Sequence, residues 1–83
     1  MIVIEYDPEA DAIYARLQPI EPGGDHGARP LDDDRMIHYN DAGSVIGVEF
    51  LGVSEGIDLK GVPDEEAIAS ALRAVGIVAA AAA

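Results

Sequence analysis

Apolar and polar residues alternate near the start of the chain, in a pattern that predicts β-strands. Residues 2–6 and 12–18 carry apolar side chains at every second position, as strands with one buried face do. Between them, Pro8 fixes φ and suits the second position of a tight turn. Asp7 can accept a hydrogen bond from a backbone N–H two residues further on. We therefore expect two antiparallel strands joined by a short turn.

The stretch 35–51 is the clearest structural signal, because two apolar runs flank the turn-forming residues 40–44. Asn, Asp and Gly tolerate a positive φ, so this stretch predicts a β-hairpin. A two-residue loop at 42–43 is favoured, since it gathers the apolar side chains on one sheet face. It pairs Tyr39 with Ile46 and Ile37 with Val48. The alternative is a three-residue loop at 41–43 with a left-handed Gly43, which would place His38 on the apolar face.

Residues 19–34 are rich in proline and glycine and are expected to form a loop that ends in the acidic turn 32–34. Successive side chains of an extended chain point in opposite directions. These three carboxylates therefore do not converge on one ion, and no metal site is predicted. Residues 57–60 are compatible with a short edge strand or with merely extended chain.

One helix is predicted from Pro63, which suits a first helical position, to Gly76, which is placed to end it. Three carboxylates fall in its first turn, where the helix dipole favours them. The apolar stripe that would pack on the sheet is Ile68, Ala71, Leu72 and Val75. The alanines 79–83 have no periodic apolar face and are expected to fray.

These elements predict a single α+β domain over residues 1–78: a four-stranded antiparallel β-meander with one C-terminal α-helix packed on one face. Apolar residues occur at both parities of the strands, so the second sheet face would remain partly apolar. The residues expected on it are Val3, Tyr14, Val45, Gly47 and Leu51. A chain of 83 residues is marginally stable alone, and such a face is a typical subunit contact, so a homodimer is predicted.

The net charge is −11, from sixteen acidic and five basic residues. Such a surface repels nucleic-acid phosphates and anionic membranes, so neither is expected as a partner. Solubility is the simplest role of this charge, and a basic protein is the partner that it would suit. Cysteine is absent, which excludes disulfides and zinc–cysteine sites. The sequence lacks a long apolar run and the features of a signal peptide, so a cytoplasmic location is expected.

Few residues are candidates for chemistry. The candidate site residues are Asp7, Asp11, Tyr14, His38, Gly47 and Glu49. A carboxylate–histidine pair can move protons, but only at hydrogen-bond distance within a cleft. In the structural alternative, Asp7 and Asp11 close a turn. Glu49 then pairs with a basic residue across strands, and His38 is exposed at a strand end. Gly47, in mid-strand, marks a bulge or the close approach of another backbone or a ligand. No catalytic residue and no cofactor is predicted.

Two motifs in the sequence resemble one protein family. They are Tyr6-Asp7-Pro8-Glu9-Ala10-Asp11-Ala12-Ile13-Tyr14-Ala15-Arg16-Leu17 and Tyr39-Asn40-Asp41-Ala42-Gly43-Ser44-Val45-Ile46-Gly47-Val48-Glu49-Phe50-Leu51. They are similar, in the same order, to the patterns Y-D-x-E-x-D-A-L-Y-I and D-Y-D-x-x-G-x-V-V-G-I-E-I-L of the domain-of-unknown-function family 2283 (DUF2283, YuzE-like). His38 and Asn40 stand where that family often has aspartates, which would weaken any acidic site built there. The resemblance implies a small α+β domain of bacterial proteins and implies no activity.

Two functions are compatible with these observations. The favoured one is a non-enzymatic, homodimeric protein-interaction or regulatory module that acts on a basic protein partner. The alternative is a small ligand-binding or hydrolase-like domain that uses Asp7, Asp11, His38 and Glu49. Convergence of these four side chains in one concave pocket would favour the alternative, whereas scattered positions would favour the interaction module.

Overall fold

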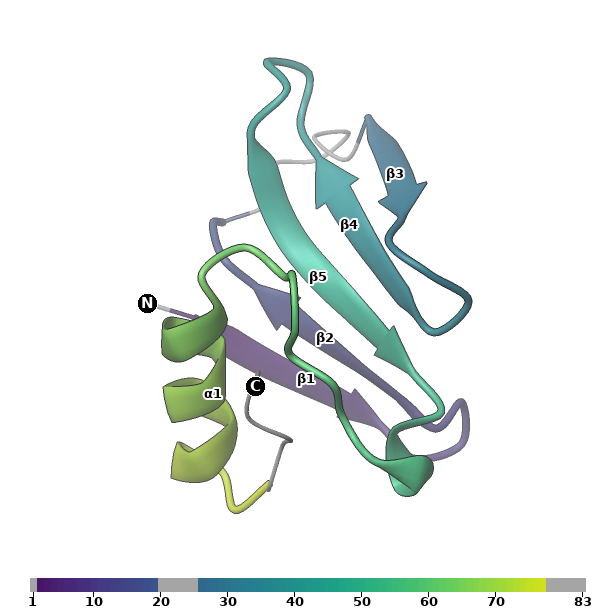
Figure 1. Ribbon diagram of the computed structural model, residues 1–83. Helices are drawn as coiled ribbons and strands as arrows, with labels where there is room; N and C mark the ends of the chain where they lie inside the picture. The colour runs from purple at the N-terminus through teal and green to yellow at the C-terminus, as the bar shows by residue number, and fades with distance from the viewer. Residues whose placement is uncertain (1, 20–25, 78–83) are drawn as a thin grey trace.

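The computed structural model describes residues 2–19 and 26–77, which form an antiparallel sheet with a helix on one side (Figure 1). The strands are β1 (Val3–Asp7), β2 (Ala12–Arg16), β3 (Gly27–Pro30), β4 (Arg35–Tyr39) and β5 (Val45–Leu51). A 3-10 turn, η1 (Val53–Glu55), follows β5, and the helix α1 (Glu65–Ala74) comes last. The α+β class is as predicted. The predicted alanine tail, 79–83, lies outside the described residues.

The strand order differs from the predicted four-stranded meander. The sheet has five strands in the order β1-β2-β5-β4-β3. The extra strand, β3, lies within residues 19–34, for which the sequence predicts a loop. All four residues of β3 are exposed, so no alternation of apolar and polar residues marks it. β5, rather than β4, pairs with β2, which places the most apolar strand at the centre of the sheet.

The turn between β4 and β5 is the three-residue loop 41–43 rather than the favoured two-residue loop. The N–H of Asn40 donates to the carbonyl of Ser44 at 2.9 Å and closes the loop. Gly43 has a φ of 82°, in the left-handed region that glycine adopts without a steric cost. The favoured loop length was therefore wrong, and the alternative that the residues left open is the one that forms.

A β-bulge beside this loop determines which residues of the hairpin share a face. Tyr39 pairs with Val45, so the expected pair of Tyr39 with Ile46 is wrong. The extra residue in β5 restores the even register further along the strands. The expected pair of Ile37 with Val48 is confirmed. The apolar side chains of both strands therefore stay on one face despite the odd loop.

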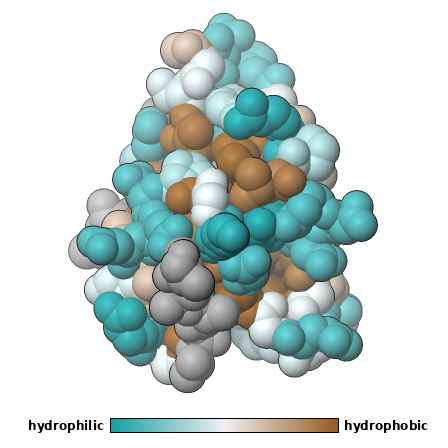
Figure 2. Space-filling model, in the orientation of Figure 1, coloured by the Kyte–Doolittle hydropathy of each residue, from teal (hydrophilic) through white to brown (hydrophobic). Residues whose placement is uncertain are grey.

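One face of the sheet is covered by α1 and by residues 52–62, an extended segment that we call the strap (Figure 1). The buried core residues are Ile13, Ala15, Val48 and Phe50 of the sheet, Ile57, Leu59 and Val62 of the strap, and Ile68 and Leu72 of α1. Each large apolar side chain that is fully buried contributes about 1.5–3 kcal/mol to folding. Figure 2 shows, from this side, apolar side chains at the surface above a band of polar ones.

The ends of α1 agree in part with the prediction. Pro63 is not the first helical residue, because it precedes the N-cap Asp64, which adopts a left-handed φ of 52°. The helix ends before Gly76, which has a φ of 81° and stops it as predicted. Val75, predicted within the apolar stripe, is 57% exposed. No helix in residues 2–19 or 26–77 is long and apolar enough to cross a membrane.

Arg35 fastens the strap to the sheet. Its side chain is only 12% exposed, and its Nη1 donates to the backbone carbonyls of Asp58 and Lys60 in the strap. Its Nε and Nη2 donate to Oδ2 of Asp32, at 3.0 and 2.7 Å. The guanidinium beside Asp32 lowers the pKa of that carboxyl below its ordinary value, and Asp32 in turn raises the pKa of Arg35. One side chain thus joins the acidic turn 32–34 to the cover of the core.

We expect Asp32 to stabilise the fold only when it is ionised. Because its pKa is lowered on folding, its contribution is present above about pH 4 and is lost as the pH falls through the folded-state pKa. Asp32 is half exposed, so replacing it with Asn should cost less than about 1 kcal/mol at pH 7. Urea unfolding at pH 7 and pH 3 measures the difference. Asp33→Asn is the control. The expectation would be contradicted if the parent and Asp32→Asn lost the same unfolding free energy between pH 7 and pH 3.

Candidate functional site

Four of the six candidate residues lie together on the sheet face opposite α1 and the strap, which we call the outer face. Strand register places them there: Tyr14 is opposite Glu49, and His38 is opposite Gly47. Tyr14 lies on β2, Gly47 and Glu49 lie on the adjacent β5, and His38 lies on β4. The even register of the hairpin, restored by the bulge, is what keeps His38 on this face rather than in the core.

His38 and Glu49 form a partly buried pair. Nε2 of His38 lies 3.0 Å from Oε1 of Glu49. An ionised carboxylate only accepts hydrogen bonds, so this contact favours the hydrogen on Nε2. The ring of Tyr14 meets the imidazole edge to face, with centroids 5.3 Å apart and planes at 67°. The aromatic contact and the carboxylate together fix the orientation of the imidazole.

Gly47 makes room for Tyr14. A Cβ built on Gly47 would overlap the hydroxyl end of the Tyr14 ring, so only glycine lets the ring lie across β5. The sequence predicted that this glycine marks a bulge or a close approach. Both occur: the bulged residue of β5 directly precedes Gly47, and the close approach is made by a side chain of the same chain. Tyr14 therefore occupies the space beside Gly47.

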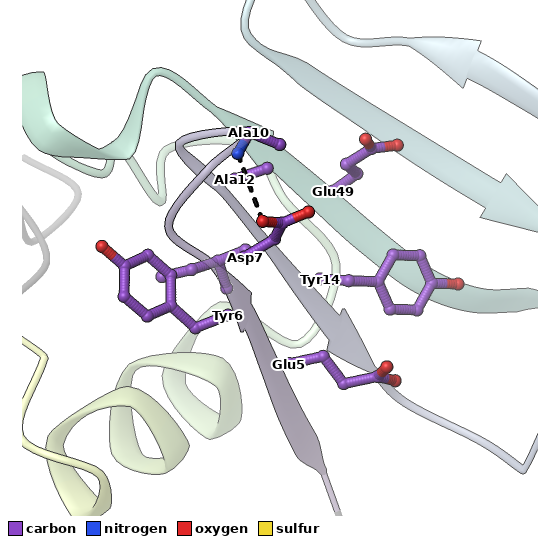
Figure 3. Close-up of a pocket in the computed structure, with 8 residues that line it drawn as sticks. Glu5, Tyr6, Asp7, Ala10, Ala12, Tyr14 and Glu49 are labelled. Atoms are coloured by element: carbon purple, nitrogen blue, oxygen red, sulfur yellow. Dashed lines mark hydrogen bonds between the residues drawn. The ribbon is translucent and has the colours of Figure 1, made fainter.

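Beside this cluster is a hollow of about 400 Å³. Glu5, Asp7, Tyr14 and Glu49 line it, and Figure 3 shows Glu5, Tyr14 and Glu49 extending to the same side of the sheet while Tyr6 extends to the other. A salt bridge of 2.6 Å joins Glu5 to Arg16 at its border. No three His, Asp or Glu side chains among the described residues are placed to hold a metal ion. The hollow is therefore an acidic depression, with the carboxylates of Glu5, Asp7 and Glu49 in its lining.

The carboxylates of Asp7 and Asp11 accept hydrogen bonds that hold local segments of the chain. Oδ1 of Asp7 accepts hydrogen bonds from the N–H groups of Glu9 and Ala10, at 3.1 and 3.2 Å, as the turn prediction requires. Figure 3 shows the bond to Ala10. Asp11 has a left-handed φ of 53° and binds Ser54, whose N–H and Oγ donate to its carboxylate at 2.8 and 2.7 Å. Asp11 thereby holds η1 and is not part of the outer-face cluster. The four acid–base candidates do not converge in one pocket.

The sequence reasoning missed Glu5 and Arg16 as residues of the outer face. The signal was available for Glu5, because Glu5 and Asp7 have the parity opposite to the apolar Ile2 and Ile4. For Arg16 the same argument applies within the second strand, where it has the parity of Tyr14. Their salt bridge required the register of β1 against β2.

The Gly47→Ala variant tests the packing of Tyr14. We expect overpacking to destabilise it by about 1–3 kcal/mol, because the ring must leave its place over β5. Thermal unfolding measures the loss, and the ring-proton shifts of His38 report the displaced aromatic ring. Gly27→Ala, also in a strand, is the control, since a Cβ there meets nothing within 4 Å. Equal stability of the two variants would refute the close packing.

The Asp7→Ala variant tests whether this aspartate is structural. Loss of its bonds to Glu9 and Ala10 should lower the unfolding free energy by on the order of 1 kcal/mol. Asp7→Asn keeps an acceptor oxygen and should stay close to the parent in urea unfolding. A fully stable Asp7→Ala would show that the turn does not depend on this side chain.

A comparison with protein families bears out the resemblance of the two motifs. The family model described as "Protein of unknown function (DUF2283)" matches residues 3–54, from the start of β1 into η1. The curated proteins and the solved structures contain no match to the chain. Since the family model matches more than half of the 83 residues, the chain belongs to the DUF2283 family.

Proposed function

We propose that this protein is a non-enzymatic, homodimeric interaction module with a regulatory role, and that its partner is a basic protein. The observation that carries the proposal is the outer face. In the part of the chain that the structure describes, α1 and the strap both pack on the opposite face. The outer face combines two exposed apolar residues, Val3 and Leu51, with the carboxylates of the hollow. Leu51 is 37% exposed. Such a mixed surface is typical of a protein contact.

The positions of the candidate acids support binding rather than catalysis. A general acid–base site needs its groups at hydrogen-bond distance around a space for substrate. Asp7 and Asp11 are engaged in a turn and in holding η1, respectively. His38 and Glu49 remain as a pair, and the Tyr14 ring packs against the imidazole. This arrangement fixes the side chains of the outer face in place, as a preformed binding surface requires.

The charge supports a basic partner. With sixteen acidic and five basic residues, the chain attracts cationic surfaces over a distance and speeds their encounter. The hollow contributes three carboxylates to this field, from Glu5, Asp7 and Glu49. Glu5 forms a salt bridge with Arg16, and Glu49 pairs with His38. A lysine or arginine of a partner would add a cation beside these carboxylates.

The alternative function, a small ligand-binding or hydrolase-like domain, has one favourable observation. The His38–Glu49 pair adjoins a hollow of about 400 Å³, which is large enough for a small molecule. Asp7, one of the residues that line the hollow, already accepts hydrogen bonds within its own turn. A ligand there would contact Glu49 directly.

Light scattering and native mass spectrometry at micromolar concentration test the proposal. We expect twice the chain mass of 8.7 kDa, and we expect Leu51→Asp to return the mass to that of one chain. Val75→Asp is the control, since it places the same charge on an exposed apolar residue of the other layer. A basic partner captured from the host at low salt should be released as the salt concentration rises.

A chain mass that stays at 8.7 kDa on concentrating would exclude the dimer. Absence of any captured basic protein in the same preparation would exclude the partner. A small molecule retained by the parent in native mass spectrometry, and lost in Glu49→Gln, would establish the ligand-binding alternative instead.

A further inference from the structure

The two edge strands of the sheet differ in how they are protected. β3 is short, is exposed along its length and contains Pro30, which has no N–H to offer a further strand. β1 contains neither proline nor a basic residue, and among the described residues it pairs only with β2. Alternate residues of such a strand direct their N–H and C=O groups away from the sheet. β1 is thus the edge to which another strand can be added.

An apolar groove runs beside this edge on the core side. Ile2 and Ile4 form one wall, and Ala67 and Ala71 of α1 with the C-cap Val75 form most of the other, around a volume of about 670 Å³. The polar residues of its lining are Asp64 and Ser70. Figure 1 shows α1 lying alongside β1. The alanines keep α1 thin on this side and so leave the groove open. Tyr6, on the same parity of β1, is 56% exposed. Every second side chain of an added strand would enter apolar surroundings.

The other parity of β1 is acidic. Glu5 and Asp7 lie on the outer face with Val3 and line the acidic hollow. In an antiparallel or parallel pair, residues side by side on neighbouring strands share a face. The remaining side chains of an added strand would therefore lie next to these two carboxylates.

We propose that the free edge of β1 takes up an extended segment of the partner protein as a sixth strand, and that this segment alternates apolar residues with lysine or arginine. The proposal rests on the proposed function and names the sequence pattern that it recognises. Backbone hydrogen bonds to β1 would supply affinity, and the groove and the carboxylates would supply specificity. Charge selects this occupant over a second copy of the chain, because pairing β1 with itself would bring the Glu5 and Asp7 carboxylates of both copies together.

The test uses two synthetic peptides of equal composition with blocked ends. The first, Thr-Lys-Val-Arg-Val-Lys-Thr, alternates apolar or small residues with basic ones, and the second, Lys-Arg-Lys-Val-Val-Thr-Thr, does not. We expect the alternating peptide to bind about tenfold more tightly or better in calorimetry. Amide hydrogen exchange should slow in β1 when this peptide binds, and should stay unchanged in β3. Glu5→Lys should weaken binding by about tenfold, and Asp33→Lys, with the same change of charge in an exposed turn, should weaken it far less.

Equal affinity for the two peptides, or protection that does not include β1, would overturn the proposal while leaving a basic partner possible elsewhere on the surface. Slow amide hydrogen exchange in β1 without peptide, together with a doubled mass, would assign the edge to a second copy of the chain. That result would also overturn the proposal. Because both peptides are tested on the unmodified chain, the result does not depend on how well Glu5→Lys folds. The dimer and the captured partner are measured separately, so failure here is distinguishable from failure of the proposed function.

Discussion

The fold depends on the burial of one side of β5. Val48 and Phe50 are fully buried beneath the strap and α1, and burial of apolar surface is the main favourable term in folding. A ten-residue helix and a short strap supply a single apolar layer, which matches a single sheet face. Arg35 holds that layer on the sheet through the backbone carbonyls of the strap. Among the described residues, no helix packs on the opposite face of the sheet.

The elements that sequence patterns predict are those whose side chains alternate between core and solvent. β1, β2, the hairpin and α1 all have such a pattern, and each is present. β3 has none, because all its residues are exposed, and it forms through its pairing with β4. The position of β5 next to β2 was also beyond the sequence. It depends on pairing between residues that are more than thirty positions apart, and local residue patterns do not carry that information.

The candidate site was predictable as a set of residues but not as an arrangement. Gly47 was recognisable because a glycine weakens a strand unless something lies close to it. That Tyr14 is its neighbour follows only from the register between β2 and β5. Asp11 shows the opposite case. Its motif position suggested chemistry, yet its partner is Ser54, which lies in a segment that no local pattern connects with it.

The outer face and the edge of β1 have different directions of approach. A strand added at the edge lies in the plane of the sheet, whereas a subunit on the outer face stacks perpendicular to it, so one does not exclude the other. Charge links the two events. The proposed dimer would bring two chains of net charge −11 together, and each basic segment bound at an edge would reduce that repulsion. Because such coupling is reciprocal, a basic partner that favours the dimer is itself bound more tightly by the dimer. Glu5, which belongs to both the outer face and the edge, is where the two contacts would meet.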